Sequence, residues 1–113
     1  MALYQEDVRG RPPEPSGTAF TRELIEGVRD EREALDLLIE RHSVGWPLDR
    51  IAPLERSILR VALYELLHRI DVPAEVAIDE AVEAAKELCS ADAPGFVNGI
   101  LGAVMRGEEV PSR

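Results

Sequence analysis

The chain has 113 residues, 45% of them hydrophobic, which suits a single domain with a core of its own. Its one cysteine, Cys89, excludes a disulfide framework or a multi-cysteine zinc site within the chain, and the lack of a membrane-spanning run or signal-peptide pattern predicts a cytoplasmic protein. The formal net charge of −9 and the aromatic content of 4% argue against tight, autonomous binding of nucleic acid, so RNA binding would need a partner.

The N-terminal part of the sequence predicts the end of one helix, a loop and then a new helix. Residues 2–9 have the pattern of last helical turns, because Leu3 and Tyr4 are apolar and no capping residue precedes them. Residues 10–17 hold three prolines and two glycines, which predicts a loop. We expect Thr18 to cap the next helix. Its inward positions are Phe20, Leu24 and Val28.

A second helix is expected to follow at once, with Asp30 as its cap, and to stop before Pro47. Its inward positions are Leu35, Leu38, Ile39 and His42. Trp46 lies in the turn after this helix, and we expect it to pack across the domain as a cover for the core.

The strongest helical pattern begins after Pro53 and predicts the central helix of the fold. Its apolar face is too wide for burial on one side, and comprises Ile58, Leu59, Ala62, Leu63, Leu66, Leu67 and Ile70. A second stripe repeats every four residues and consists of Arg56, Arg60, Tyr64 and His68. Two interpretations stay open: a basic and aromatic binding surface, or a solvated stripe with Tyr64 half-buried and Arg60 paired to a carboxylate.

Two further helices are predicted, opened by Pro73 and Pro94. The apolar positions of the first are Ile78, Ala81, Val82, Ala85, Leu88 and Cys89. Its outer row is acidic and consists of Glu75, Asp79, Glu83 and Glu87. The inward positions of the second are Val97, Ile100, Leu101 and Val104. No stretch alternates between apolar and polar residues, so the predicted fold class is all-α.

The last helix contains several small and polar residues that need an explanation. Either Ser90 or Asp92 is available to cap it. Its glycines are expected to let another helix come close, and they are Gly95, Gly99 and Gly102. We expect Asn98 to be a buried amide that ties a neighbouring backbone, and Gly107 to end the helix.

The sequence offers no catalytic, metal or cofactor site. A nucleophile needs an adjacent base, and the helical pattern does not bring Cys89 together with His42 or His68. Two scattered histidines lack metal-ligand spacing, and the acidic row lies on a helix face instead of a chelating loop. The segment 95–99 has no Lys-Ser/Thr pair and no preceding strand, as a phosphate loop would require. We therefore predict a protein that is not an enzyme.

Several sequence segments resemble those of the NusB family of transcription antitermination factors. They include Ala2-Leu-Tyr-Gln5, Phe20-Thr-Arg-Glu-Leu24 and Leu54-Glu-Arg-Ser-Ile-Leu-Arg-Val-Ala-Leu-Tyr-Glu-Leu66. Further words are Val72-Pro73, Ala77-Ile-Asp-Glu-Ala-Val-Glu-Ala-Ala-Lys86 and Phe96-Val-Asn-Gly-Ile-Leu101. Together they cover nearly the whole chain in the order typical of the family.

The resemblance implies two small helical bundles packed side by side in one domain, with helices of the first in 18–45 and of the second in 51–107. It implies a protein without cofactor that binds boxA RNA together with NusE, a ribosomal small-subunit protein. The complex would join RNA polymerase and other Nus factors and support transcription of ribosomal RNA. A membrane partner is not implied.

Site residues are carried over from the resemblance by position. Tyr4 and Glu55 match positions that face NusE, whereas Glu80, Asp92 and Phe96 match positions on or near the RNA side. The chemistry is suitable, because the Phe96 ring can stack on a base and the Asp92 carboxylate can accept hydrogen bonds from base edges.

One departure from the family concerns the arginine-rich segment that usually precedes the Ala-Leu-Tyr word, since Met1 directly precedes it here. We expect the first helix to be truncated and the basic turns omitted, which leaves RNA binding by the chain alone weak. Two alternatives stay open. One is an RNA-binding accessory domain of an RNA cytosine methyltransferase, with a catalytic domain downstream, and the other is a dimerisation module that forms a homodimer.

Overall fold

The computed structural model describes residues 15–43, 46–69 and 71–107, and within these ranges the chain forms helices and no strand. The elements are α2 (Pro15–Asp30), α3 (Arg32–His42), the 3-10 helix η1 (Leu48–Arg50), α4 (Pro53–His68), α5 (Ala74–Leu88) and α6 (Ala93–Arg106). The predicted all-α class is therefore confirmed. None of the helices described is long and apolar enough to cross a membrane. The predicted helix end at residues 2–9 lies outside the described residues.

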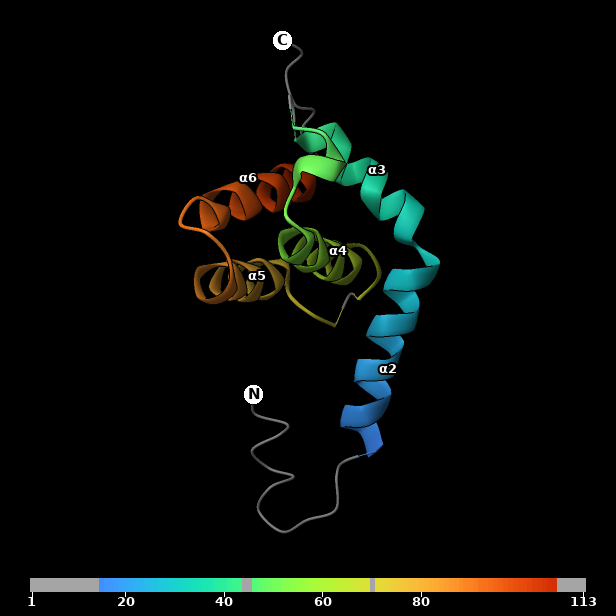
Figure 1. Cartoon of the computed structure of the whole chain (residues 1–113). Coiled ribbons are helices and arrows are strands. Elements are labelled where there is room, and N and C mark those ends of the chain that lie inside the picture. Colours follow the sequence, from blue (N-terminus) through green and yellow to red (C-terminus); the bar gives the residue numbers. More distant parts are fainter. Residues whose placement is uncertain (1–14, 44–45, 70, 108–113) are drawn as a thin grey trace.

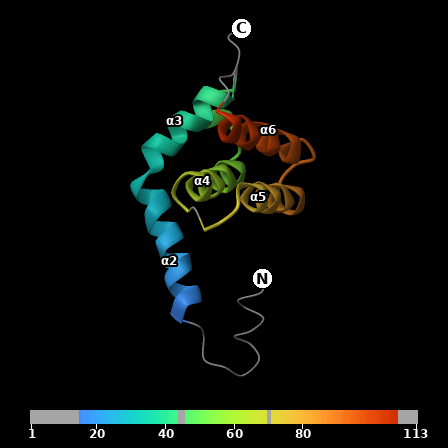
Figure 2. The ribbon, with the colours of Figure 1, turned by 180° about the vertical axis from the view of Figure 1, so that it is seen from behind.

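Helices α4, α5 and α6 form a compact group, and α2 and α3 form an arm beside it (Figure 1). Helix α3 packs against α4 and α6, whereas α2 touches α4 and then extends away from the group, as the view from behind also shows (Figure 2). Helix α2 therefore packs against the group over only part of its length.

The helix boundaries follow the chemistry of their first turns. Proline lacks an N–H group and is tolerated where that group has no partner, and Pro53 and Pro94 lie in the first turns of α4 and α6. The same property lets α2 begin at Pro15, so the predicted loop to residue 17 and the predicted start at Thr18 were wrong. Pro73 is the residue before α5 and not its first helical residue.

The junction between α2 and α3 is a bend and not a break. Asp30 ends α2, and Glu31 takes the N-cap position of α3 without a side-chain capping bond, so the prediction of Asp30 as cap was wrong. The Glu31 N–H donates to the Gly27 carbonyl at 2.9 Å, and the Leu35 N–H donates to the Glu31 carbonyl at 2.9 Å. These bonds continue the helical ladder through the junction, which keeps α2 and α3 in one arm.

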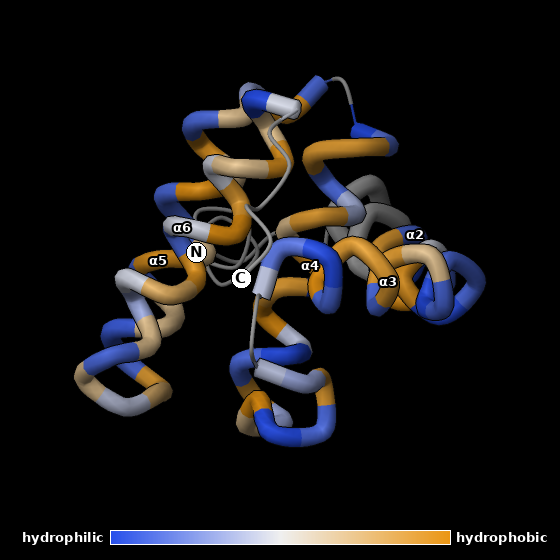
Figure 3. The backbone as a smooth tube through the Cα atoms, turned by 90° about the horizontal axis from the view of Figure 1, so that it is seen from above, coloured by the Kyte–Doolittle hydropathy of each residue, from blue (hydrophilic) through white to orange (hydrophobic). Residues whose placement is uncertain are grey.

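The core forms where the apolar faces of α3 to α6 meet. Seen from above, hydrophobic segments occur where the helices come together, and hydrophilic segments are frequent on the outside of the fold (Figure 3). The largest fully buried side chains are Leu35, Ile39, Ile51, Leu59, Leu63, Val97 and Leu101. These confirm the inward positions predicted from periodicity in α3, α4 and α6.

Several side chains predicted to lie in the interior are at the surface. Leu67 and Leu88, at helix ends, are exposed. Trp46 is 50% exposed and does not pack across the domain. Asn98 is also exposed, so its amide is not a buried tie to a neighbouring backbone. The predicted inward position of Phe20 lies outside the side chains described.

The glycines of α6 do not mark a close helix contact. A methyl group added at Gly95 or Gly99 would meet no atom within 4 Å, and at Gly102 it would meet only the flexible Arg106 side chain, at 3.0 Å. The prediction of a close helix approach was therefore wrong. Gly107 ends α6 in the left-handed conformation, with φ of 69°, as expected from its position.

We expect Gly99→Ala to raise the free energy of unfolding by about 0.5–1 kcal/mol, because alanine loses less backbone entropy in a helix and the site has room for the methyl group. Urea unfolding followed by circular dichroism would measure it. Gly107→Ala is the matched control and should destabilise the protein, since its positive φ is strained for alanine. A destabilised Gly99→Ala variant would contradict the open space seen here.

Candidate nucleic-acid interface

One end of the α4–α6 group gathers three of the predicted contact residues. Glu55 lies in the first turn of α4, Asp92 directly precedes α6, and Phe96 lies in its first turn. Cys89, which ends α5, connects these positions: burial and then the negative charge of Glu55 raise the pKa of the Cys89 thiol. Glu55 is therefore near the α5–α6 turn, and the partner-facing and RNA-facing predictions share one end of the fold.

Asp92 holds the N-cap position of α6 with its carboxylate exposed. Its side chain makes no capping hydrogen bond, although the Phe96 N–H donates to the Asp92 carbonyl at 3.3 Å. A negative charge is favourable at a helix N-terminus because the orphan N–H groups carry partial positive charge. The carboxylate is thus stably placed and still able to accept hydrogen bonds from a base edge or a partner.

Phe96 is half-buried and packs against the core cluster. The core fixes its orientation, which lowers the entropy lost when the ring meets a ligand. Only part of the ring remains available to a base, so Phe96 provides a stacking edge and not a free platform.

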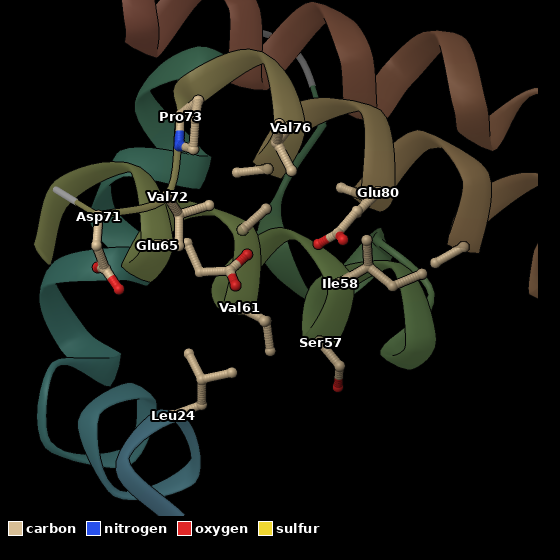
Figure 4. A pocket seen from close by; sticks show the side chains of 14 residues that line it. Leu24, Ser57, Ile58, Val61, Glu65, Asp71, Val72, Pro73, Val76 and Glu80 are labelled. Carbon is tan, nitrogen blue, oxygen red and sulfur yellow. The ribbon is translucent and has the colours of Figure 1, made fainter. Parts of the chain in front are cut away.

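Glu80 is not brought together with Asp92 and Phe96. It lines a groove of about 700 Å³ between α2, α4 and α5, and no residue of α6 lines that groove (Figure 4). Tyr4, the other residue predicted to face the protein partner, lies outside the described residues. The RNA-side role of Glu80 stays a prediction, and Glu80 lies on a different face from Asp92 and Phe96.

The groove is mostly apolar, with acidic groups in its wall. Leu24 of α2 and Val61 of α4 face it, and the carboxylates of Glu65 and Glu80 both point into it (Figure 4). Glu65 is only 8% exposed, an unusual position for a carboxylate. Sequence reasoning missed it, although the signal was present: Glu65 continues the spacing of Ile58 and Ala62 along the apolar face of α4.

Glu65 should make stability depend on pH. Burial, and next the negative charge of Glu80, raise the pKa of Glu65 above its ordinary 4.5. A carboxyl with a higher pKa in the folded state holds its proton more tightly there, so the free energy of unfolding falls as pH rises above 4.5 toward that higher pKa.

We therefore expect Glu65→Gln, which removes the charge at constant size, to stabilise the protein at neutral pH by about 1 kcal/mol, the usual scale of a single substitution. The gain should vanish below pH 4.5, where the wild-type carboxyl is protonated in both states. Urea unfolding over a pH series measures this. Glu87→Gln, on the exposed outer row of α5, is the control, and an equal gain there would contradict the role of burial.

Within the stripe of Arg56, Arg60, Tyr64 and His68, Arg60 and Tyr64 contact the α2–α3 arm, Arg56 is partly buried, and His68 at the end of α4 is exposed. Arg60 donates to both carboxylate oxygens of Asp36, at 2.7 and 3.1 Å, and the Tyr64 and His68 ring centroids are 4.9 Å apart. The ion pair of Arg60 and the half-burial of Tyr64 were predicted correctly. The middle of the stripe is thus taken up by packing and an ion pair, and only its end at His68 is exposed to solvent.

Comparison with known proteins identifies the family of the chain. A model of the NusB family matches residues 2–106 of the chain. The chain belongs to the NusB family. It is 48% identical to the transcription antitermination protein NusB of Rubrobacter xylanophilus over 109 residues, which cover 88% of this chain and 78% of that protein.

Other relatives give the same result. Identity is 48% with NusB of Nitratidesulfovibrio vulgaris, covering 89% of this chain and 65% of that protein, and 40% with NusB of Symbiobacterium thermophilum, covering 95% and 84%. The chain thus spans slightly less than two thirds of the N. vulgaris protein. The solved structure of T. maritima NusB matches with a TM-score of 0.81 and 36% identity, covering 86% of this chain and 68% of that one. The NusB-like all-α fold and a non-enzymatic protein of the antitermination class are thereby confirmed.

Proposed function

We propose that this NusB-family chain binds boxA RNA together with NusE and thereby joins RNA polymerase and other Nus factors to suppress premature termination, supporting transcription of ribosomal RNA. The observation that carries the proposal is the gathering of Glu55, Asp92 and Phe96 at one end of the α4–α6 group. A protein bound at Glu55 and an RNA strand at Asp92 and Phe96 would be adjacent, so each can stabilise the binding of the other.

The charge distribution supports the need for NusE. The chain has a net charge of −9, and two of its arginines, Arg60 and Arg69, are engaged in ion pairs with its own carboxylates. Arg60 is paired with Asp36, while Arg69 donates to Glu23 at 3.3 Å and to Asp71 at 3.0 Å. RNA affinity depends largely on neutralising phosphates, so the partner would supply most of those contacts.

Titration of labelled boxA RNA with the chain, with and without NusE, tests the proposal. We expect weak binding by the chain alone, and tight binding with NusE that weakens as salt rises. NusE alone with the same RNA is the control for its own contribution. Tight, salt-insensitive RNA binding by the chain alone would contradict the proposal.

Variants at the gathered end separate the two contacts. Glu55→Lys should weaken NusE binding about tenfold or more by charge repulsion or loss of an ion pair. Phe96→Leu, which keeps the core contact but removes the ring, should weaken RNA binding by the NusE complex about tenfold, the value of one stacked base. Asp79→Asn, on the outer row of α5, is the control. Loss of RNA binding in the control alone would place the site elsewhere.

A further inference from the structure

Trp46 is the only tryptophan of the chain, and it is 50% exposed on a firmly held backbone. The Trp46 N–H donates to the Ser43 carbonyl at 2.9 Å, and the Ser43 hydroxyl donates to the Trp46 carbonyl at 3.0 Å. Ser43 is itself buried, and the ring of Pro47 restricts the backbone on the other side. A large ring on such a backbone loses little entropy when it binds, so Trp46 has the properties of a binding platform.

This platform is separate from the contacts proposed above. In the chain Trp46 lies between α3 and η1, and α3 contacts both η1 and α6. Figure 1 shows the last turns of α3 and α6 together with η1 at one end of the fold. Asp92 and Phe96 are at the start of α6, whose 14 residues span about 21 Å. A ligand on Trp46 would therefore lie near the far end of this helix.

Basic side chains gather around Trp46, because α3, η1 and α6 all carry basic residues in their last turns. Arg41 of α3 and Arg50 of η1 are exposed, and within the described part of the chain neither forms an ion pair. Both lie within five residues of Trp46, and the Arg50 N–H donates to the Pro47 carbonyl at 2.9 Å, which keeps it close. Two guanidinium groups are thus available beside the ring.

An exposed ring with cations on either side fits single-stranded nucleic acid. Every base has a face that stacks on an aromatic ring, and guanidinium groups next to the ring can neutralise the flanking phosphates. An acidic peptide would pair with the arginines but would leave the ring without a planar partner. Since the chain has a net charge of −9, an RNA strand favours such a local group of cations over the rest of the surface.

We propose that an RNA base stacks on Trp46 while Arg41 and Arg50 contact the phosphates on either side of it. This site rests on the proposed binding of boxA RNA and extends it, because the strand that meets Asp92 and Phe96 at the start of α6 continues to the end of α6. Trp46 adds affinity without reading the sequence, since stacking tolerates every base.

Tryptophan fluorescence tests the stacking directly. A stacked base quenches the ring, so boxA RNA with additional nucleotides on both sides should cause a saturable loss of emission from the chain in complex with NusE. The Trp46→Phe complex supplies the background, because any change that remains in it arises elsewhere. RNA binding without a change in Trp46 emission would overturn the site and leave the proposed function intact, whereas a complex that binds no RNA would overturn both. Equal quenching by a polyglutamate peptide would overturn the assignment to RNA.

Substitutions separate stacking from a structural role of the ring. Trp46→Ala should weaken RNA binding by the NusE complex about tenfold, the value of one stacked base, whereas Trp46→Phe keeps a ring and should retain most of the affinity. Leu37→Ala is the matched control, since Leu37 is another exposed apolar side chain of this part of the chain. Circular dichroism will check that each variant folds. Equal losses in the two Trp46 variants, or the same loss in the control, would overturn the stacking.

The salt dependence of binding tests the two arginines. Replacing both Arg41 and Arg50 with glutamine should reduce the slope of log affinity against log salt by about 1.4, because each phosphate contact with a single strand contributes about 0.7. The matched control replaces Arg22 and Arg29, which are exposed on α2, and should leave the slope unchanged. An unchanged slope in the first double variant, or the same reduction in the control, would overturn the phosphate contacts.

Discussion

Replacing Arg60 with alanine is expected to lower the free energy of unfolding by about 3 kcal/mol, the scale observed when one partner of a buried ion pair is removed. Arg60 and Asp36 side chains are only 13% and 19% exposed, and two hydrogen bonds join them. The Asp36 carboxylate would remain between α3 and α4 with its main partner gone. Urea unfolding followed by circular dichroism measures the loss.

The second partner provides the control for this prediction. Asp36→Ala should cost a similar amount, and the double variant should lose less than the sum of the single losses, because no charge is then left unpaired. Arg32→Ala removes only the peripheral 4.0 Å contact to Asp36 and should change stability by less than about 1 kcal/mol, as exposed pairs do. A loss of that small size in Arg60→Ala would contradict the importance of the buried pair.

Gly27→Ala is expected to destabilise the protein by about 1–3 kcal/mol, the scale of an overpacked contact, although alanine is the better helix former. Helix α2 crosses α4 at Gly27, and a methyl group there would overlap the Tyr64 ring. The ring is held by its contact with His68, whose Nε2 lies 3.8 Å from Glu31 Oε1. Thermal and urea unfolding measure the effect.

Steric conflict can be separated from other effects of Gly27→Ala by removing the ring. In a Tyr64→Ala background the same substitution should become neutral or stabilising, because nothing then opposes the methyl group. Gly99→Ala is the positional control, since it makes the same change in an open helix position. Equal effects of Gly27→Ala with and without the Tyr64 ring would contradict a packing role for Gly27.

Periodicity predicted the helices well and their ends less well. Apolar spacing marked α3 to α6 because each helix buries one face, and the core residues follow that spacing. The start of α2 was missed by three residues, since three closely spaced prolines suggested a loop although Pro15 is compatible with a first turn. Asp30 has the right chemistry for a cap, but it is the last residue of α2, and Glu31 holds the N-cap position of α3.

The candidate site was only partly accessible to sequence reasoning. Glu55, Asp92 and Phe96 were named from family words, and the structure adds that they share one end of the fold. Glu80 was named with them, yet it faces the groove beside Glu65, because it lies on the side of α5 that turns toward α2 and α4. That groove is formed by three helices, so no single stretch of sequence contains it.

The sequence by itself determined the all-α class, the family and the inward face of most helices, because these depend on local residue spacing and on short motifs within single helices. Only the tertiary structure decided which faces are covered. The arm of α2 and α3 packs on Arg60 and Tyr64 in the middle of the predicted stripe, so these residues form an ion pair and a packing contact in place of a binding surface. The groove that Glu65 and Glu80 line likewise depends on how α2, α4 and α5 come together, which no local spacing decides.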